Sequence, residues 1–245
     1  MKNQLKKKLM KRRTVNFIRF ILEDVLPPFL RDSFIFKLIV KKLYRKDRTH
    51  EILKKEILWL SDEEYRNYYA NMPNIQGDTD NSDECIKEII KNIIPNDVID
   101  VGCGNGYLLD QIKKNYLANH ELKLSGSEIV KTNKLNDISI ENNITIYEKP
   151  IEKISDINLK FDTTICTHVL EHILEINKAY DELKKITKKR LIIIVPKERP
   201  YNYTFNGHIH FFPYDWSFIN TIKPKTKNFK IYEVYRDFVY IEDLI

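Results

Sequence analysis

Five short apolar runs, separated by helix-length segments, constrain most strongly how this chain of 245 residues can fold. The runs are rich in β-branched residues and cover 97–101, 122–128, 144–148, 161–167 and 190–196. Strands that alternate with helices form a parallel sheet with helices on both faces. The tail "FKIYEVYRDFVYIEDLI" carries two further strand patterns without a helix between them, which predicts an antiparallel hairpin at a sheet edge. We therefore predict an α/β fold with a doubly wound, mostly parallel seven-stranded sheet.

The N-terminal region follows a different pattern. From Lys2 to about Tyr69, apolar residues recur at steps of three and four, which predicts helices, and Pro27–Pro28 divides them. Residues 71–84 are polar and rich in turn-forming residues, which predicts a linker or loop. We assign residues 1–75 to a basic helical arm or cap and residues 76–245 to the α/β domain.

Charge is unevenly distributed along the chain. Residues 1–48 hold 15 Lys and Arg against 4 Asp and Glu, a net charge of +11, so the other 197 residues carry −5 of the total of +6. The basic arm has three interpretations: a solvated amphipathic helix, a contact with anionic lipid headgroups, or a grip on phosphates of RNA or of a nucleotide-linked substrate. The acidic body lacks a recognisable RNA-binding module, so nucleic acid is the less favoured partner.

Several protein classes are disfavoured by composition. No run approaches the roughly 18 apolar residues of a membrane-spanning helix. The basic N-terminus has no apolar core of a secretory signal. Cys85, Cys103 and Cys166 are scattered and odd in number, which favours a reducing compartment over a disulfide framework. We predict a cytoplasmic protein, and the sequence leaves its oligomeric state open.

A glycine loop follows the first predicted strand. In "VIDVGCGNGYLL", glycines at 102, 104 and 106 allow a sharp turn and a close approach to a ligand. No Gly-Lys-Ser/Thr follows, so the phosphate-binding loop of the Walker type is absent, and the third glycine comes one residue early for the dinucleotide spacing. Asp100 precedes the loop, and Glu128 closes the second strand, where a carboxylate suits ribose hydroxyls.

These residues resemble those of class I S-adenosylmethionine-dependent methyltransferases, close to the type 11/12 group. The resemblance rests on "DVGCGNG", Glu128, "FDTTICTHVLEH" and "LIIIVPK", and covers about residues 85–245. It implies a Rossmann-like methyltransferase fold with S-adenosylmethionine as cofactor. The binding residues that it implies are Asp100, Gly102, Cys103, Gly104, Gly106, Glu128, Ile129, Glu148, Ile151 and Thr167.

Histidines cluster after the fourth and fifth strands. His168, Glu171 and His172 stand at i, i+3 and i+4, so a helix that begins there places them on one face. His208 and His210 follow the fifth strand and return to the same sheet edge. The alternative is that Glu171 only caps or orients, while His172 packs or acts as a base. We predict that all five residues are catalytic, and that His168, Glu171, His172 and His208 bind a divalent metal.

Within the family, this pattern resembles that of small-RNA 2′-O-methyltransferases, which bind a metal through E-x-x-E-H and a later His. Glu171 and His172 match, "VPKERPYN" loosely matches a later stretch of that family, and His168 replaces the first glutamate. An imidazole in place of a carboxylate favours Mn²⁺, Fe²⁺ or Zn²⁺ over Mg²⁺.

The predicted function is metal-assisted O-methyl transfer. In size and style the chain resembles bacterial methyltransferases of capsule and surface-glycan biosynthesis, which implies a small anionic or nucleotide-linked acceptor with a phosphoramidate or sugar oxygen. Two alternatives stay open: an RNA 2′-O-methyltransferase, and a non-catalytic module that binds S-adenosylmethionine.

Overall fold

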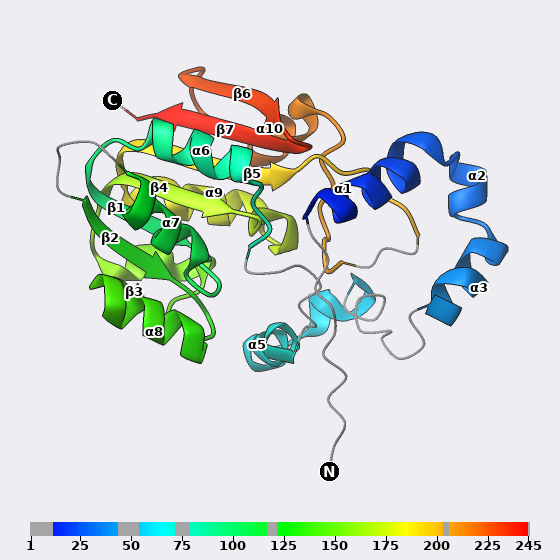
Figure 1. The fold of residues 1–245 in the computed structure, drawn as a ribbon, viewed down its shortest axis with the longest axis horizontal. Coiled ribbons are helices and arrows are strands. Elements are labelled where there is room, and N and C mark those ends of the chain that lie inside the picture. The colour runs from blue at the N-terminus through cyan, green and yellow to red at the C-terminus, as the bar shows by residue number, and fades with distance from the viewer. Residues whose placement is uncertain (1–11, 44–53, 72–78, 117–121, 203–205, 245) are drawn as a thin grey trace, which may run out of the picture.

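The computed structural model describes residues 12–43, 54–71, 79–116, 122–202 and 206–244 (Figure 1). Residues 72–78 of the predicted linker (71–84) fall outside these ranges, as does the proposed domain boundary at residue 75, whereas residues 83 and 84 begin a helix that ends at Asn92. Within the described residues, no helix combines the length and the apolar character that a membrane crossing requires.

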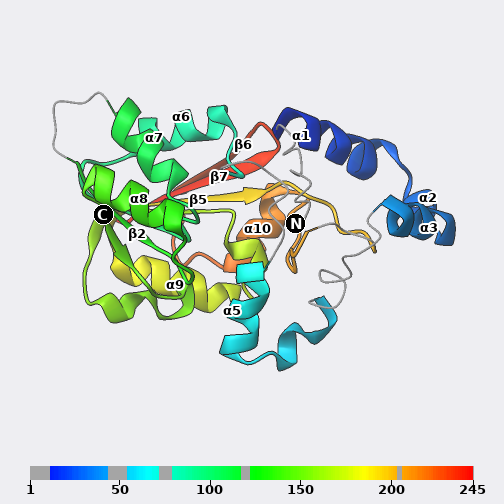
Figure 2. The same ribbon diagram turned by 60° about the horizontal axis from the view of Figure 1, so that its bottom comes forward.

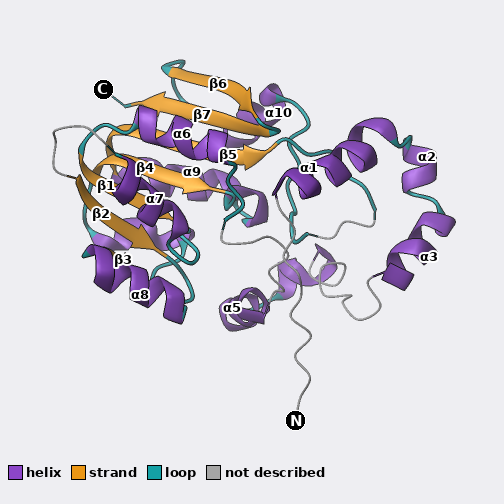
Figure 3. Ribbon diagram, in the orientation of Figure 1, coloured by secondary structure: helices purple, strands orange, loops and turns teal. Residues whose placement is uncertain are grey.

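A seven-stranded sheet with the order β3-β2-β1-β4-β5-β7-β6 lies between the helices of the α/β body (Figure 3). The first five strands are parallel, and β7 pairs antiparallel with β5 and with β6. The predicted fold class is therefore confirmed. Strand bounds are Asn96–Val101 (β1), Leu122–Ser127 (β2), Thr145–Tyr147 (β3), Phe161–Thr167 (β4), Thr187–Pro196 (β5), Phe229–Val234 (β6) and Asp237–Asp243 (β7).

The sheet is buried on both faces, which explains why its central strands are continuous apolar runs. Along β5, Leu191, Ile193 and Val195 join the core on one face, while Ile192 and Ile194 join the core on the other. The first core contains residues of α9 (Ile176–Ile186) and α10 (Asp215–Ile222). The second contains residues of α6 (Asp83–Asn92), α7 (Tyr107–Asn115) and α8 (Asn133–Asn142).

The N-terminal helices lie beside this α/β body (Figures 1 and 2). They are α1 (Arg12–Phe20), a π-helical turn (Ile21–Val25), α2 (Pro28–Arg31), α3 (Phe34–Leu43), a short 3-10 turn (Ile57–Trp59) and α5 (Asp62–Asn71). The break that the sequence predicts at Pro27–Pro28 lies between the π-helical turn and α2, where Pro27 is the N-cap and Pro28 the first residue of α2, because proline has no backbone donor to continue a preceding helix.

Polar groups attach the N-terminal helices to the body. The Arg19 guanidinium donates to the carbonyl of Lys197 at 2.7 Å, just beyond β5. The amide of Asn16 donates to the carbonyl of Tyr235 at 3.4 Å, in the turn between β6 and β7. These contacts bring α1 to the sheet edge at which β1, β4 and β5 end.

Candidate active site

The glycine loop leaves β1 with three positive φ angles. Gly102, Gly104 and Gly106 have φ values of 77°, 55° and 82°, which residues with a side chain rarely adopt. A Cβ atom at Gly102 would lie 2.3 Å from Cγ2 of Val169, so the loop packs directly against the segment after β4. A Cβ atom at Gly104 would meet nothing within 4 Å, which leaves open space in front of the loop.

Two carboxylates border the loop. Glu128 accepts hydrogen bonds from the backbone N–H groups of Gly104 at 2.7 Å and Ile129 at 2.8 Å, so the carboxylate is fixed beside the glycines. Asp100 is almost completely buried, and its Oδ1 atom has no hydrogen-bond partner. Burial, together with the nearby Glu128, raises the pKa of Asp100 to about 7.

The other predicted cofactor residues lie around the same edge. Cys103 is buried in the loop and its N–H donates to the carbonyl of Ser127. Glu148 follows β3 directly, and Ile151 is buried one turn later. The Thr167 hydroxyl, at the end of β4, accepts from the amide of Asn81 at 2.9 Å.

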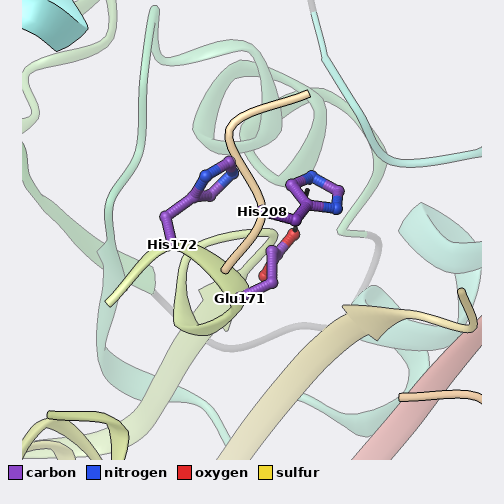
Figure 4. Close-up of side chains that lie close together, drawn as sticks. All are labelled: Glu171, His172 and His208. Carbon is purple, nitrogen blue, oxygen red and sulfur yellow. Dashed lines mark ion pairs between the residues drawn. The ribbon is translucent and has the colours of Figure 1, made fainter. Parts of the chain in front are cut away.

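Glu171, His172 and His208 come together at the neighbouring strand ends (Figure 4). One ligand atom from each lies within 4.8 Å of the others, which is the spacing of a metal-binding group. Glu171 and His172 belong to a single 3-10 turn (Leu170–His172) directly after β4, and His208 comes from the loop after β5. The backbone N–H groups of Ile209 and His210 both donate to the Glu171 carbonyl, and these bonds hold the two segments together.

The local backbone differs from the sequence-based expectation. His168 has a φ of 54°, in the left-handed region, so no α-helix begins there, and the predicted shared helical face of His168, Glu171 and His172 is wrong. His168 still points toward the group, because its Nδ1 atom lies 3.5 Å from Oε1 of Glu171. It lies outside the three-residue cluster and contacts it through Glu171.

The Glu171 carboxylate is electrostatically unusual. It is fully buried, and neither oxygen has a hydrogen-bond partner, because Nδ1 of His168 lies 3.5 Å and Nε2 of His208 3.9 Å from Oε1. Burial opposes ionisation, but the imidazoles of His168, His172 and His208 lower the pKa of Glu171 to about 2. Burial also lowers the pKa of His172, to about 4, with a contribution from His208. An ionised carboxylate and a neutral imidazole are the forms that bind metal ions.

Glu198 is a site residue that sequence reasoning missed. Its carboxylate forms a very short hydrogen bond with Nδ1 of His208 and accepts from the amide of Asn206 at 2.6 Å. Burial opposes protonation of His208, but Glu198 raises its pKa above the ordinary value. A carboxylate on Nδ1 leaves Nε2 to face Glu171, which is the arrangement that orients metal-binding histidines. The signal for Glu198 was its position two residues after Pro196, at the end of β5.

Tyr65 of the N-terminal helices contacts the site, and His210 lies beside it. The Tyr65 hydroxyl of α5 donates to the His172 carbonyl at 3.2 Å. Tyr68 is half-buried, and the side chain of Tyr69 falls outside the described residues. Nε2 of His210 is 2.9 Å from the Ile173 carbonyl, so His210 binds backbone rather than the Glu171 carboxylate.

Comparison with known proteins identifies the fold and the kind of domain. Residues 99–195 match a family model described as a methyltransferase domain. A SAM-dependent methyltransferase from Aquifex aeolicus is 16% identical, with a TM-score of 0.50, covering 65% of this chain and 89% of that chain. PigF with SAH is 13% identical, with a TM-score of 0.50, covering 66% of this chain and 62% of that chain. No curated protein matches the sequence.

The fold is therefore that of the Rossmann-like methyltransferases. The match of residues 99–195 to a methyltransferase domain supports an S-adenosylmethionine-dependent methyltransferase. The residues at the glycine loop fit this cofactor. The open space before Gly104 accommodates a ligand, the fixed Glu128 carboxylate suits ribose hydroxyls, and the buried, unpartnered Asp100 oxygen is suited to a cationic group.

Proposed function

We propose that this methyltransferase acts on an oxygen of a small anionic acceptor and uses a divalent cation bound by Glu171, His172 and His208. The observation that carries the proposal is the placement of the Glu171 carboxylate, which is fully buried, forms no hydrogen bond and lies beside the imidazoles of His172 and His208. A buried carboxylate in this state is unfavourable unless a cation lies beside it. Two imidazoles at 4.8 Å or less complete a ligand set that suits Mn²⁺, Fe²⁺ or Zn²⁺.

The residues divide the work between two neighbouring strand ends. The loop of β1 and Glu128 of β2 would bind S-adenosylmethionine, which supplies a methyl group on a positively charged sulfur. Glu171, His172 and His208 would hold the cation, which when bound favours the ionised form of an acceptor oxygen. Contact between Val169 and Gly102 supports the idea that acceptor and cofactor are positioned together, because the two segments pack against each other.

Cationic side chains beside the cluster support an anionic acceptor. Arg19 reaches the Lys197 carbonyl and interacts electrostatically with Glu198. Lys54 lies 5.1 Å from the centre of the Phe211 ring, and burial lowers its pKa to about 8, although Glu198 counters this effect. The assignment to a phosphorylated or nucleotide-linked precursor of surface carbohydrate rests on this charge pattern together with the resemblance in sequence.

Calorimetry with Mn²⁺ and with S-adenosylmethionine tests the two halves of the site separately. We expect the wild-type protein to bind both ligands, and His172→Ala to lose Mn²⁺ binding while retaining S-adenosylmethionine. Equal Mn²⁺ affinity of the variant and the wild type would contradict the metal site. Failure of the wild type to bind S-adenosylmethionine would instead favour a scaffold function.

A panel of phosphorylated sugars, nucleotide sugars and single-stranded RNA is offered to the enzyme as acceptors. Formation of S-adenosylhomocysteine from S-adenosylmethionine then identifies the acceptor that is methylated. We expect turnover with a member of the sugar set and its loss after treatment with a chelator. Turnover with RNA alone would support the 2′-O-methyltransferase alternative. Full activity after chelation would exclude assistance by a metal.

A further inference from the structure

Helix α1 contacts the protein with its polar side and leaves its apolar side exposed. Asn16 and Arg19 are directed to the body, where they donate to the carbonyls of Tyr235 and Lys197. On the opposite side, Phe17 is 64% exposed, and Phe20 and Ile21 are exposed as well. A helix on the surface of a globular protein normally has the reverse orientation, with its apolar stripe toward the core.

Helix α2 repeats this inversion, and α3 exposes apolar side chains as well. In α2, the guanidinium of Arg31 is buried and donates to the carbonyls of Leu22 and Pro200, while Phe29 is 74% exposed. In α3, Phe34 is 70% exposed, and Ile35, Leu38 and Ile39 are also exposed. Such a concentration of large apolar side chains on one segment indicates an interaction surface, because isolated monomers rarely expose them together.

The three helices form an arc on the side of the molecule away from α7 and α8 (Figures 1 and 2). Their exposed apolar side chains belong to the part of the chain with a net charge of +11, whereas the rest carries −5. An anionic surface therefore attracts the helices and repels the body, which sets the orientation of approach.

We propose that α1, α2 and α3 dock the protein on an anionic phospholipid bilayer. Exposed Phe, Ile and Leu side chains insert at the boundary between headgroups and acyl chains, and basic residues of the segment 1–48 other than Arg19 and Arg31 attract the anionic headgroups. The same α1 helix reaches the Lys197 carbonyl with its polar side, so docking places the methyl-transfer site at the membrane surface. The proposal concerns a surface outside the site and does not depend on the metal.

Two other occupants fit the surface less well. A second copy of the chain would bring two segments 1–48, each with a net charge of +11, together in a self-complementary contact, and the like charges repel. Single-stranded RNA would use the positive charge and stack on aromatic rings, but it would leave Ile35, Leu38 and Ile39 without an apolar partner.

Flotation with lipid vesicles tests the proposal on the full-length protein. We expect the wild type to float with vesicles of equimolar phosphatidylcholine and phosphatidylglycerol, but not with pure phosphatidylcholine. The triple variant Phe17→Ser, Phe29→Ser and Phe34→Ser should bind at least about tenfold more weakly, because three apolar side chains no longer leave water. A matched triple variant of exposed residues of the body, Ile140→Ser, Leu159→Ser and Leu174→Ser, should bind as the wild type does.

Thermal unfolding and S-adenosylmethionine titration of both triple variants check that they are folded. Wild-type protein that does not float with the anionic vesicles would overturn the proposal, as would equal flotation of the Phe triple variant. A dimer in sedimentation velocity that the Phe variant abolishes, without vesicle binding, would assign the surface to a second copy. RNA binding that is equal in the wild type and the Phe variant, again without vesicle binding, would assign the basic arm to nucleic acid.

Discussion

The two halves of the site differ in how their carboxylates are satisfied. At the ends of β1 and β2, Glu128 receives backbone hydrogen bonds from Gly104 and Ile129, so the protein itself completes this half. At the ends of β4 and β5, Glu171 is fully buried and has no hydrogen-bond partner. The comparison teaches that backbone N–H groups fix the carboxylate of the cofactor half, whereas the carboxylate of the cluster half faces only imidazoles, at 3.5 Å and 3.9 Å, without a hydrogen bond.

The largest effect on metal binding is expected from a substitution of Glu171, in the half of the site that holds Glu171, His172 and His208. Glu171→Gln removes the only carboxylate of the three-residue group and replaces it with a neutral amide of the same shape. We expect Mn²⁺ affinity and methyl transfer to fall by more than about 100-fold. Loss of a residue that only orients a metal ligand costs about 10- to 100-fold, and loss of a ligand itself costs more. Metal analysis of the purified protein and calorimetry measure this loss. Unchanged affinity for S-adenosylmethionine is the internal control, and retention of Mn²⁺ would contradict the assignment.

A smaller effect on metal binding is expected at Glu198, which contacts His208 and is not itself a member of the three-residue cluster. Glu198→Gln keeps an oxygen near Nδ1 of His208 but removes the charge that orients and supports this imidazole. We expect Mn²⁺ affinity to fall by about 10- to 100-fold. Asn206→Ala, which removes only the amide that donates to Glu198, is the milder comparison. Equal Mn²⁺ affinity of Glu198→Gln and the wild type would mean that His208 needs no orienting partner.

Gly104→Ala tests the cofactor half. The new methyl group would project into open space before the loop, at a φ of 55° that costs roughly 1 kcal/mol for a residue with a side chain. We expect affinity for S-adenosylmethionine to fall about tenfold, or about 1.4 kcal/mol, with Mn²⁺ binding unchanged. Calorimetry with each ligand separates the two halves. A parallel loss of Mn²⁺ binding would show that the halves are coupled.

Asp100→Asn tests the cofactor half through the pH dependence of protein stability. Burial raises the pKa of Asp100 from 3.8 to about 7, so the unfolded chain ionises first as pH rises. In the cofactor-free wild type, stability is therefore lost between about pH 4 and pH 7. The variant avoids this loss of up to about 4 kcal/mol, but it buries an unpartnered amide at a cost of about 1–3 kcal/mol.

For Asp100→Asn we expect a net advantage of about 1–3 kcal/mol at pH 8, which becomes a disadvantage of about 1–3 kcal/mol as pH falls toward 4. Urea unfolding of both proteins across this range measures it. An advantage that is independent of pH would show that Asp100 does not titrate in this window.

The smallest effect is expected at His210. Because its Nε2 atom binds the Ile173 carbonyl, His210→Gln should lower stability by about 1 kcal/mol. Mn²⁺ affinity should stay within about twofold of the wild type, because His210 does not contact the Glu171 carboxylate. Substitutions away from a buried or binding feature usually change free energies by no more than about 0.5 kcal/mol. The matched comparison is His208→Gln, which should abolish metal binding. Strong loss of Mn²⁺ in His210→Gln would place His210 in the cluster after all.

The two halves also differ in how far the sequence predicts them. The glycine loop, Asp100 and Glu128 lie at consecutive strand ends, and a parallel sheet brings such ends to one edge. The predicted strand 161–167 coincides with β4, and the tail forms the predicted hairpin. The helical interpretation of His168 to His172 failed, because periodicity does not report that His168 adopts a left-handed backbone. Glu198 was missed because its importance depends on a contact with His208 ten residues away.

The sequence by itself determined the alternation of strands and helices, the glycine loop, its acidic neighbours and the asymmetry of charge. Each of these depends on local backbone preferences or on burial along a single element, which residue type and spacing encode. Only the tertiary structure decided which histidines meet Glu171, that Glu198 supports His208, and that α1 turns its polar side inward. Those outcomes depend on distances between segments far apart in the chain, and packing, rather than local preference, fixes them.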